Sequence, residues 1–382
     1  MSNWVEMRLS EIAEINPHEV LKKGAVAKKV PMDKLQPYCR DIPEFIIEPY
    51  SGGAKFRNGD TIMARITPCL ENGKIAQVNI LDENEVGFGS TEYIVFRARK
   101  GNDADFIYYL VSSSLVKEPA IKSMVGSSGR QRVQIDVIQN LLLKVPELKT
   151  QRAIASILKG LDDKIGENNK VNHNLQQQAQ VLYHQMFCSM PHPDWRNGVL
   201  SDIADIVMGQ SPDGKSYNED GIGTVFYQGR AEFGTRFPTQ RLFTTEPKRM
   251  AQENDVLISV RAPVGDLNVA KEDCCIGRGL GAVRSKDGHQ SFVLYTMFAL
   301  RSQLNVFNGE GTVFGSINRD SLNSLPVIIP PITEINKFEA LVAPMDKAIR
   351  TNHDEICHLQ SLRDALLPRL MSGEIDVSEV KL

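Results

Sequence analysis

The sequence predicts an α+β protein: two mixed α/β domains in pseudo-twofold tandem repeat, joined by two long antiparallel coiled-coil helices. The first observation is a repeated helix entrance, because VPELKTQRAIASILKGLDDKI at 145–165 returns as IPPITEINKFEALVAPMDKAI at 329–349. The second is a repeated beginning, because WVEMRLSEIAEI at 4–15 is matched by WRNGVLSDIADI at 195–206. Repetition at such a long interval indicates a chain built from two equivalent halves.

The two halves share a frame and differ in the segments that fill it. NGDTIMARITP at 58–68 is matched, with one residue of slack, by ENDVLISVRAP at 253–263. Between these landmarks the segments 17–57 and 208–252 differ in length and residue type. We therefore expect one backbone plan that carries two different surfaces.

Each half reads as a mixture of strands and helices. Short apolar runs bounded by Gly, Pro and Asn predict strands at Thr91–Phe96, Val225–Tyr227 and Val256–Val260. Helical patterns are interspersed at Asp105–Ser112 and Ser291–Arg301. The predicted boundaries are a first domain at 1–148, a central helix at 149–190, a second domain at 191–331 and a C-terminal helix at 332–382.

Both helices carry apolar residues at alternating steps of four and three, which is the 3.5-residue repeat of a coiled-coil seam. Asn168 and Asn352 occupy equivalent seam positions, where an amide fixes the register at some cost in stability. Gly160 and Pro344 predict an irregular turn. A helical hairpin inside one core is the alternative to an exposed coiled coil. The proposed seam residues are Ile154, Leu158, Leu161, Ile165, Asn168, Leu175 and Leu182 in the first helix, and Phe338, Val342, Met345, Ile349, Asn352, Leu359 and Leu366 in the second.

Composition describes an ordinary globular protein, with 42% hydrophobic and 24% charged residues. No apolar run approaches the roughly 18 residues that span a bilayer, and the N-terminus lacks a secretory signal pattern. The six cysteines form no CxxC pair, so we expect reduced thiols and a cytoplasmic protein without a membrane partner.

The charge balance gives no global attraction to nucleic acid. The net charge is −3, with 19 basic and 19 acidic residues in 1–148 and 14 and 16 in 191–331. Binding to DNA would therefore need local basic clusters or a more basic partner.

Several catalytic motifs are missing from the sequence. Pro330-Pro331 is not part of an Asn/Asp-Pro-Pro-aromatic tetrad, and we expect no phosphate-binding loop in this chain. Gly277-Arg-Gly-Leu-Gly281 has the wrong spacing for a dinucleotide loop and is interpreted as a tight turn. Asp213, Glu246 and Lys248 have the letters of a metal-dependent nuclease, but Pro247 disfavours the strand that such a site needs. We predict no catalytic residues and no metal site.

The helical segments and the ending LPRLMSGEIDV at 367–377 resemble the specificity subunit of type I restriction–modification systems over essentially the whole chain. The resemblance implies a non-catalytic subunit with two target-recognition domains, each reading one half of a bipartite double-stranded DNA site. The helices would set the spacer and dock methyltransferase subunits. Those partners methylate adenine with S-adenosylmethionine, and a restriction/translocase subunit that uses ATP and Mg²⁺ joins them. No cofactor is expected in this chain.

Candidate DNA contacts lie in loops and turns that carry donors for phosphate or guanine. The polar loop Gly126–Arg132 and its counterpart Gly309–Arg319 are the main candidates. For any one residue a solvated surface side chain is an equally good interpretation. The candidates are Lys55, Arg57, Arg65, Ser127, Ser128, Arg130, Gln131 and Arg132 in the first half, and Gln228, Arg230, Arg261, Thr312, Asn318 and Arg319 in the second.

Two other classes of function remain open on sequence alone. The first is a coiled-coil adaptor that binds proteins and never reads DNA. The second is a stand-alone nuclease, which would have to cleave DNA in a metal-dependent way without partners. Binding to random duplex DNA with and without a methyltransferase subunit tests the adaptor, and metal-dependent cleavage by the purified chain tests the nuclease.

Overall fold

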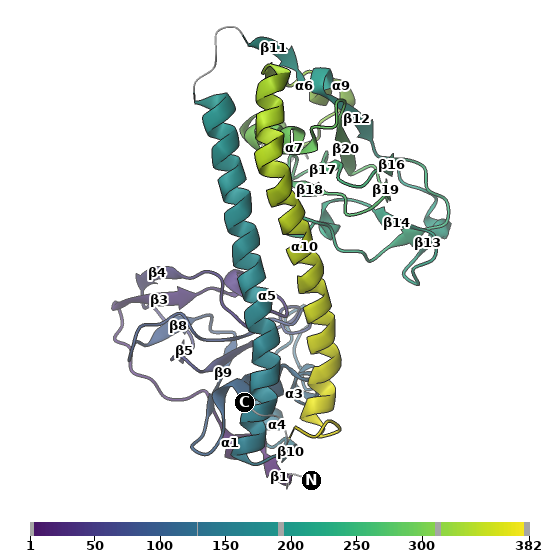
Figure 1. Cartoon of the computed structure of the whole chain (residues 1–382). Helices are drawn as coiled ribbons and strands as arrows, with labels where there is room; N and C mark the ends of the chain where they lie inside the picture. Colours follow the sequence, from purple (N-terminus) through teal and green to yellow (C-terminus); the bar gives the residue numbers. More distant parts are fainter. Residues whose placement is uncertain (1–3, 128, 190–194, 310–314, 378–382) are drawn as a thin grey trace. The chain divides into compact units, whose positions relative to one another are not determined.

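The structure is a computed structural model, and it describes residues 4–127, 129–189, 195–309 and 315–377. The chain divides into two compact units: unit 1 is Met1–Lys170 with His353–Leu382, and unit 2 is Val171–Asn352. Each unit contains one globular domain and part of each long helix (Figure 1). The units thus divide the two helices between them, whereas the sequence suggested separate helical segments.

In unit 1 two sheets and a two-stranded ribbon form the globular domain. The antiparallel sheet has the order β2-β9-β6-β7, with strands β2 (Ala13–Ile15), β9 (Tyr93–Ala98), β6 (Thr61–Ala64) and β7 (Ile75–Gln77). The mixed sheet has the order β4-β3-β8-β5, with strands β4 (Ile46–Pro49), β3 (Val26–Val30), β8 (Gly87–Gly89) and β5 (Lys55–Phe56). The ribbon pairs β1 (Val5–Arg8) with β10 (Leu142–Val145).

Unit 2 repeats this plan with one strand more. Its antiparallel sheet has the order β12-β20-β17-β18, with strands β12 (Ala204–Met208), β20 (Leu280–Ser285), β17 (Val256–Ser259) and β18 (Leu267–Val269). Its mixed sheet has the order β13-β15-β14-β19-β16, with strands β13 (Tyr217–Asn218), β15 (Phe243–Thr244), β14 (Thr224–Tyr227), β19 (Cys274–Ile276) and β16 (Met250–Ala251). The ribbon pairs β11 (Arg196–Val199) with β21 (Pro326–Ile329).

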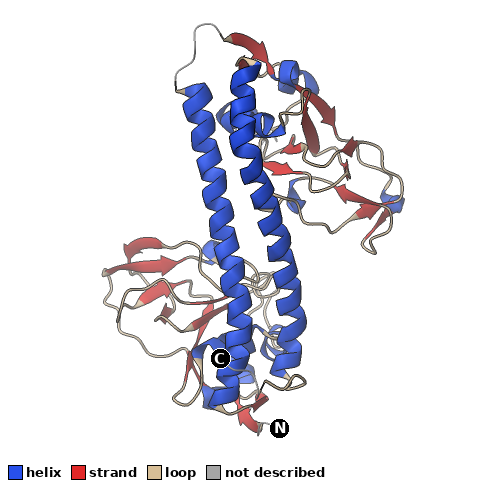
Figure 2. Ribbon diagram, in the orientation of Figure 1, coloured by secondary structure: helices blue, strands red, loops and turns tan. Residues whose placement is uncertain are grey.

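Short helices accompany each sheet (Figure 2). Those of unit 1 are α1 (Leu9–Ile12), α2 (Ala104–Ser112), α3 (Ser114–Lys122) and α4 (Ile135–Gln139), with a 3₁₀ turn at Met32–Lys34. Those of unit 2 are α6 (Leu200–Ile203), α7 (Gln290–Ala299), α8 (Arg301–Leu304) and α9 (Arg319–Asn323), with 3₁₀ turns at Gly214–Ser216, Arg230–Glu232 and Asn305–Asn308. The predicted strands and helices are confirmed to within a few residues.

The antiparallel sheet of each domain, which contains β6 in unit 1 and β17 in unit 2, lies between two hydrophobic cores. In β6, Ile62 packs into the core beneath the mixed sheet, whereas Met63 packs into the core shared with α2. In β17 the same alternation sends Leu257 to one core and Ile258 to the other. Successive side chains of a strand point to opposite faces, so a sheet covered on both faces reads as a continuous apolar run.

An ion pair between an arginine and a buried aspartate lies at the same point of both domains. Asp60 accepts hydrogen bonds from Arg97 Nε at 2.7 Å and Nη2 at 2.6 Å. Asp255 accepts from Arg284 Nε at 2.8 Å and Nη2 at 2.7 Å. Both aspartates are buried. The match of residue type and geometry confirms that the two domains are copies of one frame.

The long helices are continuous. α5 spans Leu148–Tyr183 and leads into a π-helical turn at His184–Cys188, and α10 spans Ile332–Met371. Gly160 and Pro344 both lie inside these helices, and the predicted irregular turn is absent from the secondary structure there. α10 ends at Met371, and Gly373, two residues later, has a φ of 75°, which suits a glycine after a helix C-terminus.

The two helices run antiparallel within each unit. In unit 1, Asn168 Nδ2 donates to Glu355 Oε2 at 2.8 Å, and Arg363 Nη1 donates to Asp162 Oδ1 at 2.8 Å. In unit 2, Asn352 Nδ2 donates to Asn172 Oδ1 at 2.9 Å. None of the fourteen predicted seam side chains is exposed. The predicted fold class is therefore confirmed.

The ends of the helices belong to the domain cores as well as to each other. In unit 2 the ring of Phe338 lies 5.7 Å from that of Tyr183 and 5.9 Å from that of Tyr295 in α7. In unit 1, Ile154 and Leu158 join the core that contains α2. The helices are therefore partly a coiled-coil pair and partly core elements.

Candidate nucleic-acid interface

Three backbone segments meet at one edge of the domain in unit 1. Arg65 N, after β6, donates to Glu92 O at 2.9 Å. Val133 N donates to Arg65 O at 2.9 Å, and Thr67 N donates to Gln131 O at 3.1 Å. We call this meeting of residues 65–67, 90–92, 125–127 and 129–133 the loop junction of the first domain.

The second domain has the same junction. Val260 N donates to Gly279 O at 2.9 Å, Ile317 N to Val260 O at 3.0 Å and Ala262 N to Gly315 O at 3.0 Å. Residues 260–262, 277–279 and 315–317 are thus the loop junction of the second domain. Because the hydrogen bonds correspond one to one, Glu92 matches Gly279 and Arg132 matches Ser316.

In the first domain the junction carries an ion pair beside free cations. Arg132 donates from Nε to Glu92 Oε2 at 2.9 Å and from Nη2 to Oε1 at 2.6 Å. These bonds, with the nearby charge of Arg65, hold the pKa of Glu92 below its usual value. Arg65 Nε is buried without a hydrogen-bond partner among the described residues. Arg130 is exposed and has no ion pair within the described part of the chain.

In the second domain the junction carries basic and amide side chains. Arg261 and Arg278 are exposed, and so is Gln228, the residue that follows β14. A Cβ on Gly277 would lie 2.7 Å from the carbonyl oxygen of Gln228, so only glycine permits this close backbone approach. Sequence reasoning missed Arg278 because the glycine-rich turn around it was set aside as having no binding role.

Three other predicted DNA contacts are engaged inside their own domains. Lys55 Nζ donates to the backbone oxygen of Glu19, and Arg57 Nε donates to the Glu19 carboxylate at 2.6 Å. Arg230 forms an ion pair with Asp266, which also accepts from Arg301 at 3.1 Å. These cations are already neutralised by carboxylates or held by the backbone.

Three of the remaining candidates lie in a loop or at the start of a helix. Asn318 caps α9, because its Oδ1 accepts from Ser321 N at 2.8 Å. Arg319, the first residue of α9, is exposed, and Ser127 is exposed in the loop after α3. The candidates Ser128 and Thr312 lie outside the described residues.

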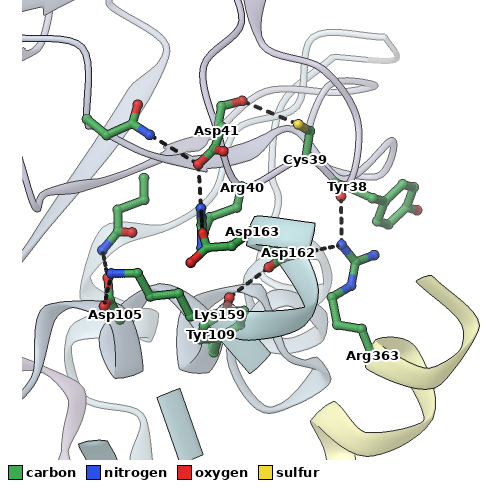
Figure 3. A network of polar contacts seen from close by, with 12 residues as sticks. Tyr38, Cys39, Arg40, Asp41, Asp105, Tyr109, Lys159, Asp162, Asp163 and Arg363 are labelled. Carbon is green, nitrogen blue, oxygen red and sulfur yellow. Dashed lines mark hydrogen bonds and ion pairs between the residues drawn. The ribbon is translucent and has the colours of Figure 1, made fainter. Parts of the chain in front are cut away.

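A buried polar network attaches the first domain to the long helices (Figure 3). The Tyr109 hydroxyl of α2 donates to Asp162 Oδ2 of α5 at 2.7 Å, and Arg363 of α10 donates to the other oxygen of that carboxylate. Arg40 Nη2 donates to Asp163 at 2.6 Å. Burial, together with the charge of Asp162, raises the pKa of Tyr109.

Unit 2 repeats part of this network. Tyr295 of α7 donates to Asp346 of α10 at 3.0 Å, and Arg236 forms an ion pair with the same aspartate. Arg40 and Arg236 sit at matching points of the frame, because their carbonyl oxygens accept from Gln77 N and Val269 N in β7 and β18. The repeat of Asp162 as Asp346 was visible in the sequence, but its partners were not.

The letters of a nuclease site do not assemble into a metal site. Asp213 Oδ1 accepts from Lys215 N at 2.9 Å and caps a 3₁₀ turn. Across residues 4–127, 129–189, 195–309 and 315–377, no group of three or more His, Cys, Asp or Glu side chains could hold a metal ion. In the same described ranges, no helix is long and apolar enough to cross a membrane.

Comparisons with known proteins agree with this arrangement. The model of the type I restriction modification DNA specificity domain matches residues 1–177 and 193–352. A Methanocaldococcus jannaschii protein that carries the name of the MjaX type I restriction enzyme specificity subunit is 30% identical over 369 aligned residues, which cover 91% of this chain and 85% of that protein. The HindI specificity subunit of Haemophilus influenzae is 21% identical over 404 aligned residues, covering 84% of this chain and 87% of that protein.

The fold also matches a solved structure. The S subunit of a type I restriction–modification system from M. genitalium has a TM-score of 0.60 and 14% identity, with 97% of this chain and 96% of that chain covered. The residues matched by the family model include both domains, both loop junctions, most of α5 and about half of α10. The chain therefore belongs to the family of type I restriction enzyme specificity subunits.

Proposed function

We propose that this chain reads a bipartite site in double-stranded DNA, with each domain contacting one half-site through its loop junction. The observation that supports this most strongly is the junction itself. Its backbone hydrogen bonds are the same in both domains, whereas its side chains differ. A common frame with different donors and acceptors suits two half-sites of unlike sequence, because base edges are distinguished by their hydrogen-bonding groups.

In the same proposal, α5 and α10 set the spacer between the half-sites and dock methyltransferase subunits. The repeated helix entrance supports this, because a frame with pseudo-twofold symmetry offers the same surface to two copies of one partner. Restriction/translocase subunits complete the assembly. Neither domain has a net positive charge, so the partners supply much of the phosphate contact.

The chain is proposed to act without chemistry of its own. The sequence has no Asn/Asp-Pro-Pro-aromatic tetrad. Contrary to the expectation from the sequence, residues 209–216 (GQSPDGKS) have the letters of a GxxxxGK[ST] loop, but their 3₁₀ turn at Gly214–Ser216 leads into strand β13 and not into the helix that follows a phosphate-binding loop. S-adenosylmethionine, ATP and Mg²⁺ therefore belong to the partner subunits in this proposal. The cytoplasm is the proposed location, because that is where such a complex meets DNA.

The test is methylation by the chain with and without its partner. The chain is co-expressed with the methyltransferase subunit, the complex is purified, and methylated positions in genomic DNA are sequenced. We expect a two-part methylated site from the complex and no labelled methyl transfer from the chain alone. Methyl transfer by the rigorously purified chain would overturn the non-catalytic assignment, and a complex that methylates without sequence preference would favour a protein adaptor.

A further inference from the structure

The loop junction of the first domain contains a carboxylate where the second domain has none. Glu92 and Gly279 occupy the same place, because Arg65 N and Val260 N donate to their carbonyl oxygens at the same distance of 2.9 Å. Arg132, which holds Glu92, corresponds to Ser316. The Glu92–Arg132 ion pair therefore occurs in the first domain and has no counterpart in the second.

A carboxylate at a DNA interface has few favourable partners. Phosphates and base carbonyl oxygens repel it. The exocyclic amino groups of cytosine and adenine attract it, and both are displayed in the major groove. An acid in a DNA-reading loop can therefore select a base with an amino group and reject a base that presents a carbonyl oxygen at that position.

The geometry of Glu92 leaves it able to accept such a hydrogen bond. Two nitrogens of Arg132 occupy one side of the carboxylate. A carboxylate has about four lone-pair sites, so acceptor capacity remains. The Glu92 side chain is 22% exposed and that of Arg132 is 47% exposed. The bidentate contact fixes the orientation of the carboxylate before any ligand arrives.

We propose that Glu92 is a specificity-determining residue of the first domain, which accepts a hydrogen bond from the exocyclic amino group of a cytosine or an adenine. Arg132 is a positioning residue, which acts by orienting Glu92 and not by binding phosphate. The inference rests on the proposed function, because it assumes that the loop junction faces DNA. Arg130, exposed and without an ion pair in the described residues, is instead the phosphate contact of this loop.

The experiment uses the complex with its methyltransferase subunit and duplexes in which each base pair of both half-sites is replaced in turn. In Glu92→Ala we expect the preference at one base pair of the first half-site to fall by roughly tenfold. The identity of the base pair at which the preference falls shows whether Glu92 contacts a cytosine or an adenine. Glu92→Ala also frees Arg132, so the double variant Glu92→Ala/Arg132→Ala should relax the same base pair without any gain in affinity for random DNA.

Two single variants separate positioning from phosphate contact. Arg132→Gln should relax the same base pair as Glu92→Ala and leave the salt dependence of binding unchanged. Arg130→Ala should weaken binding to all sequences and reduce the slope of log K against log salt by about one. Discrimination at the second half-site, measured in the same complexes, verifies that each variant is folded.

Contrary outcomes are distinct. The Glu92→Ala complex could keep every base preference of the wild type and only bind random DNA more tightly. That result would mean that Glu92 merely neutralises Arg132, and the inference would be wrong. If Arg132→Gln changes the salt slope and no base preference, Arg132 is a phosphate contact. Both results would leave the proposed function intact, whereas a wild-type complex without any base preference would remove the proposed function itself.

Discussion

Asp162 shows how a single residue can join a domain to both long helices. Its carboxylate accepts from the Tyr109 hydroxyl at 2.7 Å and from Arg363 at 2.8 Å. The side chains of Asp162 and Arg363 are only 5% and 10% exposed. Arg363 also pairs with Asp364, whose side chain is 65% exposed. The same guanidinium therefore has a buried partner and a solvated one.

This arrangement predicts unequal costs for the removal of the two acids. Asp162→Ala removes the buried carboxylate partner of Arg363, leaves that guanidinium with only its solvated carboxylate partner, and takes the acceptor from the buried Tyr109 hydroxyl, so it should cost about 3–5 kcal/mol in the free energy of unfolding of unit 1. Asp364→Ala, the matched control, should cost about 0–1 kcal/mol because its partner contact is solvated. Hydrogen exchange across a urea series measures the loss in α2, with α7 of unit 2 as an internal reference. Equal losses would mean that burial does not decide the strength of these pairs.

At the scale of the element, α5 and α10 place polar side chains where their seam needs a defined register. Asn168 pairs with Glu355 in unit 1, and Asn172 pairs with Asn352 in unit 2. A shift of one helix by a heptad would strand these groups among apolar neighbours. The Asn172–Asn352 contact also identifies positions on the two helices that face each other.

A paired insertion tests whether these helices act as the spacer. Seven residues added after Asn172 and seven after Thr351 lengthen both helices at one level by about 10.5 Å. That is about 3 base pairs, which also rotates the far half-site by about 100° around the duplex. We expect methylation to move to sites with a longer spacer or to be lost, as read by methylome sequencing.

The control is the same heptad in α5 alone, which offsets the seam and should give an unstable or inactive protein. Methylation that persists at the original spacing and rate in the paired variant would show that these helices do not set the distance between half-sites.

At the scale of the whole molecule, the two domains share one backbone frame and differ in other segments. The Asp60–Arg97 and Asp255–Arg284 pairs and the junction hydrogen bonds are common to both domains. The mixed sheets differ, with four strands in the first domain and five in the second. The shared parts hold the frame, and most strands of the differing mixed sheets lie in the segments 17–57 and 208–252, which also differ in sequence.

Because the two domains share a frame but differ elsewhere, we expect each to read its half-site independently of the other. Replacement of residues 1–148 by the corresponding domain of a relative should change one half of the methylated sequence and leave the other half intact. The reciprocal replacement of residues 191–331 is the control and should change only the other half. Sequencing of methylated sites measures both. A single replacement that altered both halves together would mean that the two domains do not read independently.

The sequence by itself determined the doubled frame, the strands at Val225–Tyr227 and Val256–Val260, and the two long helices. These features depend on periodicity and repetition, which are local and additive along the chain. The sequence did not reveal that residues 65–67, 90–92, 125–127 and 129–133 meet, because hydrogen bonds between segments far apart in sequence bring them together.

Only the tertiary structure decided which charged side chains remain available to a ligand. Arg57 and Arg132 look alike in the sequence as basic residues near turns, as Arg130 does. The fold pairs Arg57 with Glu19 and Arg132 with Glu92, and leaves Arg130 exposed. Glu92 lies 40 positions from Arg132, and Glu19 lies 38 from Arg57. An ion pair depends on distance in space, and chain folding sets that distance across such separations, so no local pattern can reveal it.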